Sequence, residues 1–151
     1  MKFHALVSAV LLTAALLTAA LSPGALAHDD ATLDATRAPN GGQVRMAGAW
    51  HYELVVAPAG SKASSLPVVV YVTDHASVKT PTAGATGSVT ILGGGKKATI
   101  ALQPDGDNRM KGGGAYAPTP DMKAVVSIAL PGQPAQQARF TPLAVAAHKA
   151  H

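Results

Sequence analysis

The amino-acid sequence predicts an all-β protein: a small antiparallel β-sandwich or open barrel with immunoglobulin-like proportions, preceded by a signal-peptide helix. The first observation is that short runs of alternating apolar and polar residues, or of β-branched residues, recur at spacings of about 8 to 14 residues. The second is that turn sequences rich in Gly, Pro, Asn and Asp separate these runs. The third is that no segment after residue 27 shows a convincing helical period.

The start of the chain has the three parts of a cleavable signal peptide. Lys2 provides a positive start, residues 5–21 form an uninterrupted apolar run, and Ala25-Leu26-Ala27 supplies the small side chains that signal peptidase reads. Ser22-Pro23-Gly24 interrupts the apolar run before this site, which is a poor end for a permanent membrane anchor. We therefore expect export to the periplasm, no stable membrane insertion after cleavage, and His28 as the first residue of the mature protein.

The mature chain is expected to divide into an arm, one domain and a tail. Residues 28–39 are polar and aperiodic, which predicts a flexible N-terminal arm. Residues 40–142 form the predicted β-sandwich domain, and residues 143–151 form an alanine-rich, flexible C-terminal tail. With the signal peptide at 1–27, this organisation gives a single domain in a chain of 151 residues.

Seven or eight short strands are expected within the domain. The clearest spans 50–56, where the polar residues His51 and Glu53 alternate with aromatic and aliphatic residues. Gly93-Gly94-Gly95 joins two strands as a hairpin, and the glycines of 109–114 predict a weak strand at an edge of the sheet. The predicted strands are residues 43–46, 50–56, 67–73, 88–92, 96–102, 109–114, 122–130 and 136–140.

The composition excludes several classes of function. The formal net charge is +4 and the 12 Lys and Arg residues are scattered, so we expect no nucleic-acid partner. The chain has no cysteine, which excludes disulfides, iron–sulfur clusters, blue-copper sites and thiolate zinc sites. It contains no Gly-x-Ser-x-Gly elbow, phosphate loop, His-Glu-x-x-His motif or calcium loop, so we do not expect an enzyme.

Histidine remains as the residue type that could carry chemistry, because imidazole binds copper, zinc and nickel near neutral pH. After cleavage, His28 could chelate one ion through its α-amine and its ring nitrogen, as one half of a copper brace. The alternative is that His28 is simply the residue that follows the cleavage site. His148 and His151 have the spacing of one helical turn but lie at the chain end, and their role stays open.

Two pairs of residues in the domain are candidates for a metal site. His51 and Glu53 project from the same side of one strand and offer a nitrogen and an oxygen donor. The alternative for this pair is a solvent-facing polar contact. Asp74 and His75 offer the same two donor types at the end of another strand. The alternative for them is an Asx-type turn with an exposed imidazole ring.

Several short motifs are together similar to those of one group of proteins. They are Gly41-Gly42-Gln43-Val44, Gly48-Ala49-Trp50-His51-Tyr52-Glu53-Leu54-Val55, Val70-Tyr71-Val72-Thr73-Asp74-His75, Ala83-Gly84-Ala85-Thr86-Gly87 and Gly106-Asp107-Asn108-Arg109. From about Pro39 to Pro142 the chain resembles small periplasmic proteins of Gram-negative bacteria. These in turn resemble the N-terminal module of periplasmic adaptor subunits in heavy-metal efflux systems of the resistance-nodulation-division type.

The resemblance implies a β-rich, non-catalytic domain that handles copper, zinc or related ions. The matching positions are His51, Glu53, Asp74 and His75. The family often has His-Gly-Gly where this chain has Asn40-Gly41-Gly42, so one candidate ligand is absent here.

The first hypothesis is therefore a periplasmic metal-homeostasis accessory protein that catalyses no reaction. It would buffer a Cu or Zn ion or pass it to periplasmic efflux components, and its expected ligands are His28, His51, Glu53, Asp74 and His75. The alternative hypothesis is a metal-free envelope module. Such a module would dock a partner protein through a sheet edge or through the neighbourhood of Trp50, Tyr52 and Tyr71.

Overall fold

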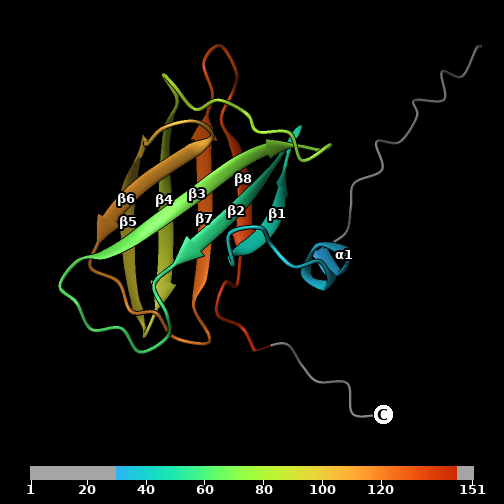
Figure 1. Ribbon diagram of the computed structural model, residues 1–151. Coiled ribbons are helices and arrows are strands. Elements are labelled where there is room, and N and C mark those ends of the chain that lie inside the picture. The colour runs from blue at the N-terminus through green and yellow to red at the C-terminus, as the bar shows by residue number, and fades with distance from the viewer. Residues whose placement is uncertain (1–29, 146–151) are drawn as a thin grey trace, which may run out of the picture.

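The structure is a computed structural model that describes residues 30–145 of the chain (Figure 1). The helix is α1 (Asp30–Ala35). The strands are β1 (Gln43–Ala47), β2 (Trp50–Val56), β3 (Leu66–Asp74), β4 (Thr86–Gly93), β5 (Lys96–Pro104), β6 (Arg109–Gly114), β7 (Lys123–Ala129) and β8 (Gln136–Phe140). All eight predicted strands are present, and their bounds differ from the predicted ones by no more than two residues at either end.

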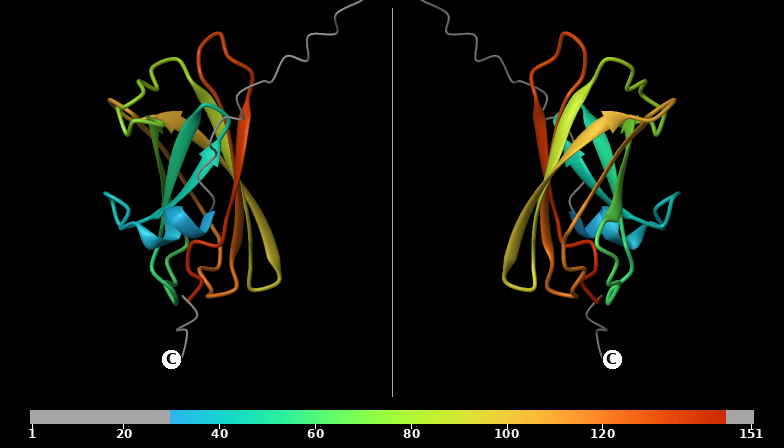
Figure 2. Two further views of the ribbon diagram at one scale, coloured as in Figure 1. Left: turned by 90° about the vertical axis from the view of Figure 1, so that its right-hand side faces the viewer. Right: turned by 90° about the vertical axis from the view of Figure 1, so that its left-hand side faces the viewer.

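The strands form one antiparallel sheet in the order β1-β2-β3-β6-β5-β4-β7-β8. The sheet curls until its two end strands, β1 and β8, lie side by side, so that it nearly closes into a barrel (Figure 2). At this seam the backbone N–H of Thr141 donates a hydrogen bond of 2.8 Å to Oε1 of Gln43. The all-β prediction is confirmed, and of its two architectures the open barrel describes the molecule.

The core fills the inside of the barrel with alternate residues of each strand. On β2, Tyr52 and Leu54 are fully buried, and Trp50 and Val56 pack partly against them, as the period-two pattern predicts. Apolar residues at alternate positions of the other strands complete the core. Among them are Val68, Val70, Val72, Val89, Ile91, Leu102, Met110, Val126, Ile128 and Phe140.

The prediction that residues 109–114 form an edge strand is wrong. β6 lies inside the sheet: it pairs with β3 along its length and with β5 at Gln103–Lys111 and Pro104–Met110. Its glycines serve close packing instead. A Cβ on Gly112 would overlap the carbonyl oxygen of Ala101 on β5, so the missing side chain is what lets the two strands cross.

One element was not predicted, because six residues make less than two helical turns and show no readable period. This element is α1, which lies in the predicted N-terminal arm and is held by Arg45 of β1. Nη1 of Arg45 donates to Oδ1 of Asp34 at 2.7 Å, and Nη2 donates to Oδ2 at 3.0 Å. This hydrogen-bonded pair lowers the pKa of Asp34 below its usual value. Asp30 adds a second contact, 3.4 Å from Nε of the same arginine.

The predicted signal peptide and the predicted C-terminal tail lie at the two ends of the chain. The predicted signal peptide at 1–27 and residues 146–151 lie outside the described residues. At the start of the predicted tail, Leu143 packs against the core. Within residues 30–145, no helix has the length and apolar character needed to cross a membrane.

Candidate metal site

The hairpin of β1 and β2 places Met46 directly opposite His51. Gly48 sits in the connecting turn with φ of 60°, and in the register that follows Ala47 faces Trp50 and Met46 faces His51. Nε2 of His51 lies 3.1 Å from Sδ of Met46. Two donor types that bind transition metals, an imidazole nitrogen and a thioether sulfur, are therefore adjacent.

His75 reaches the same place from the end of β3. His51 faces Thr73 across the β2–β3 ladder, and His75 lies two residues beyond Thr73 on the same side. The imidazole rings of His51 and His75 are stacked, with centroids 5.0 Å apart and an angle of 19° between their planes. We call Met46, His51 and His75 the Met–His cluster.

The segment that precedes β1 covers one side of this cluster. It forms one wall of a hollow of about 330 Å³ on the outer face of the sheet. The hollow is lined by Thr32, Leu33, Thr36, Arg37, Ala38, Pro39, Val44, His51, Thr73, His75 and Ser77. His51 is only 8% exposed, whereas His75 is exposed. The cluster thus has one sheltered ring and one ring that solvent reaches.

Glu53 shares the outer face of β2 with His51, but its carboxylate is already occupied. Oε1 accepts the backbone N–H of Asn40 at 2.7 Å and that of Gly42 at 3.0 Å. Oε2 accepts the side-chain amide of Asn40 at 2.8 Å. The side chain is 5% exposed, so the pair of His51 and Glu53 is buried rather than solvent-facing. Glu53 fastens the segment before β1 to the sheet.

Asp74 has a local structural partner set as well. Its Oδ1 accepts the backbone N–H groups of Ala76 and Val78, both at 2.8 Å. This is the Asx-type turn that the sequence left open as one interpretation. The turn continues through Ser77, which has a φ of 63° and donates its N–H to the carbonyl of Asp74. Asp74 therefore shapes the loop that presents His75.

The structure brings together two of the five predicted ligands. His51 and His75 are in contact, whereas the carboxylates of Glu53 and Asp74 accept hydrogen bonds from the backbone N–H groups of Asn40 and Ala76. His28 lies outside the described residues. Within residues 30–145, no group of three or more His, Asp or Glu side chains has the arrangement of a metal site. The third member of the cluster, Met46, was not predicted.

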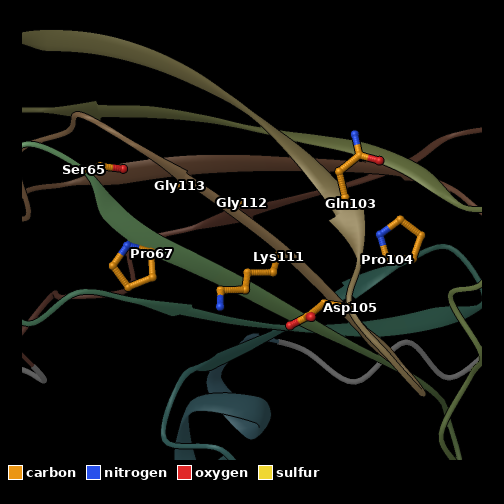
Figure 3. Close-up of a pocket in the computed structure, with 8 residues that line it drawn as sticks. All are labelled: Ser65, Pro67, Gln103, Pro104, Asp105, Lys111, Gly112 and Gly113. Carbon is orange, nitrogen blue, oxygen red and sulfur yellow. The ribbon is translucent and has the colours of Figure 1, made fainter.

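A second hollow lies away from the cluster, beside β3 and β6 (Figure 3). It has a volume of about 520 Å³, and Figure 3 shows Lys111 and Asp105 along it with Pro67 and Pro104. None of the predicted site residues lines it. The Met–His cluster therefore remains the site that the predicted residues support.

No known family model matches the sequence, and none of the curated proteins shows significant similarity to it.

Proposed function

We propose that this protein binds one copper or zinc ion through His51 and His75 and buffers or passes on that ion in the periplasm. The observation that carries the proposal is the stacking of the two imidazole rings with centroids 5.0 Å apart. The protein acts beside a heavy-metal efflux system as an accessory and catalyses no reaction. The resemblance of residues 39–142 to efflux-associated periplasmic proteins supports this role.

The two rings are close enough for one ion to lie between them after they turn. Metal–imidazole bonds are about 2.0–2.1 Å long, so two nitrogens on one ion lie about 3.3–4.1 Å apart. Each imidazole lone pair lies in the plane of its ring, so the rings have to turn out of the observed stack before both nitrogens point at one ion. His75 is exposed and can make that rotation, while His51 is held in the wall of the hollow. The pair thus combines a fixed ligand with a movable one.

A metal ion that only two imidazoles coordinate is easier to transfer than to store permanently. A structural metal site has four protein ligands, whereas this pair leaves coordination positions open. Predicted cleavage after Ala27 would make His28 a further donor through its α-amine and ring. A partner protein or water can take the same positions, which is what release of the ion to an efflux component requires.

Isothermal titration tests the proposal directly. The protein is purified from its host after any signal-peptide cleavage, and its intact mass is recorded. We expect it to bind one Cu(II) or Zn(II) ion with a dissociation constant below about 10 μM. His51→Asn and His75→Asn should each weaken binding by about tenfold or more, because each removes a ligand. The matched control is Thr73→Val, which lines the same hollow without offering a metal donor and should change the affinity by less than about twofold.

Two further measurements separate the parts of the proposal. His28→Ala in protein of recorded N-terminus reports whether the free terminus contributes: an unchanged affinity removes His28 from the ligand set. Absence of any binding tighter than about 10 μM in the unaltered protein overturns the proposed function. A partner captured from periplasmic extract and retained in chelator would favour the metal-free docking module instead.

A further inference from the structure

We infer that the Met–His cluster is selective for Cu(I), with the thioether of Met46 as its third ligand. This inference rests on the proposed function, which itself requires only the two histidines. It assigns a role to Met46 and chooses one ion among those that two imidazoles could hold.

The first step is the chemical type of the donor atoms in the cluster. The two carboxylates nearest in sequence, those of Glu53 and Asp74, each accept two hydrogen bonds from backbone N–H groups. The remaining donors are two imidazoles and a thioether. Zinc sites use thiolate, imidazole and carboxylate, whereas thioether sulfur is a soft ligand that selects Cu(I). A neutral set of two nitrogens and one sulfur therefore favours the monovalent ion.

The second step is geometry. A metal bonded to imidazole at about 2.0 Å and to sulfur at about 2.3 Å in a trigonal arrangement holds the two donor atoms about 3.7 Å apart. Nε2 of His51 and Sδ of Met46 are now 3.1 Å apart, so they need to separate by less than an ångström. Met46 is only half-buried and has three rotatable side-chain bonds, which makes this movement easy.

The third step is how the three donors are held. Met46 and His51 face each other across the β1–β2 ladder, so hydrogen-bonded strands fix their Cα positions, and the Asx-type turn of Asp74 positions His75 after the end of β3. Leu33, Pro39 and Val44 line the hollow that His51 and His75 also line, and they give that side of the cluster an apolar wall. A sheltered site with few ligands suits an ion of low coordination number. Because His75 is exposed, the ion can enter and leave the cluster on that side.

The test uses Ag(I) as a redox-inert probe for Cu(I), and Zn(II) as the competing probe. Methyl NMR of the unaltered protein distinguishes Met46 from Met110 and Met122, both of which are fully buried and serve as internal references. We expect Ag(I) nitrate to shift the ε-methyl signal of Met46 and to leave the two reference signals in place. Zn(II) chloride, bound by the histidines alone, should shift the Met46 signal much less than Ag(I) nitrate does and should also leave the two reference signals in place.

The matched variant is Met46→Leu, which removes the sulfur and keeps a similar volume. We expect it to weaken Ag(I) binding by about tenfold or more and to change Zn(II) binding by less than about twofold. An unmoved Met46 methyl signal, or Ag(I) binding that Met46→Leu does not change while His75→Asn abolishes it, overturns this inference and leaves the proposed function standing. If the proposed function itself is wrong, none of these ions binds to the unaltered protein.

Discussion

Asn40 bonds twice to the carboxylate of Glu53, through its backbone N–H at 2.7 Å and through its side-chain amide at 2.8 Å. A third bond comes from the N–H of Gly42 at 3.0 Å. Because Glu53 is 5% exposed, these bonds replace water around a buried carboxylate. They fix the segment before β1 against the outer face of β2, beside the Met–His cluster.

Glu53→Ala should therefore destabilise the fold without removing a metal ligand. The substitution removes three hydrogen bonds to a charged acceptor, each of which contributes about 1.5–3 kcal/mol at most because water can reach the donors of exposed Asn40. We expect the free energy of unfolding, measured by urea denaturation, to fall by at least about 2 kcal/mol. Glu53→Gln, which keeps one oxygen acceptor, should lose less. Unchanged stability together with lost metal affinity would make Glu53 a ligand and contradict this assignment.

The role of Asp74 can be separated from ligation by two variants. Asp74→Asn keeps an oxygen that accepts the N–H groups of Ala76 and Val78, so the turn and the position of His75 should persist. Asp74→Ala removes the acceptor and should cost about 1 kcal/mol of folding free energy, while loosening His75. Titration with Zn(II) and Ag(I) should show affinity kept in Asp74→Asn and weakened in Asp74→Ala. A large loss in Asp74→Asn would show that the carboxylate itself binds the ion.

The sequence predicts the barrel well because its dominant signals are local. Alternation within 50–56 identifies the core face of β2 directly, since neighbouring residues of a strand point to opposite sides. Glycine and proline mark turns by their own backbone preferences. The position of β6 was not predictable in the same way. Its glycines signal a missing side chain, but β6 lies inside the sheet because it also pairs with β3, which is distant from it along the chain.

The candidate site is only partly predictable for the same reason. His51 and His75 could be chosen by residue type, but their contact depends on the register of β2 and β3. Met46 was missed because four residues lie between it and His51 along the chain. A signal existed: a two-residue turn at Gly48 and Ala49 puts residue 46 opposite residue 51. The predicted turn was one residue longer and left that register undefined.

The salt link between Asp34 and Arg45 predicts that acid releases α1 from the barrel. The hydrogen bond from Arg45 lowers the pKa of Asp34 from its usual 3.8, so the ionised carboxylate is favoured when α1 is docked. Its contribution is complete above that usual value and is lost as the pH falls through the lowered pKa. We expect the amide signals of α1 in NMR spectra to move toward unstructured positions below a pH of about 4.

Two variants control this acid experiment. Asp34→Asn should show the released spectrum already at neutral pH, because the amide cannot form the charged pair. Asp121→Asn is the matched control, since Asp121 makes no ion pair within residues 30–145. An acid transition that persists in Asp34→Asn with unchanged midpoint would assign the release to another group.

Tyr52 predicts a loss of stability at high pH. Its side chain is fully buried in the core, and burial raises the pKa of Tyr52 to about 12. The unfolded chain loses this proton near pH 10 and the folded one only near 12, so stability is complete below pH 10 and falls between about pH 10 and 12. The shift corresponds to roughly 3 kcal/mol of folding free energy once both states are ionised.

The variant that tests this is Tyr52→Phe. It loses a long hydrogen bond of 3.4 Å to the carbonyl of Ile128, which costs about 1 kcal/mol or less at neutral pH. Urea denaturation across this range should thus find the unaltered protein equal or more stable at pH 8 and Tyr52→Phe more stable at pH 12. Parallel curves for the two proteins would show that Tyr52 ionises alike in both states.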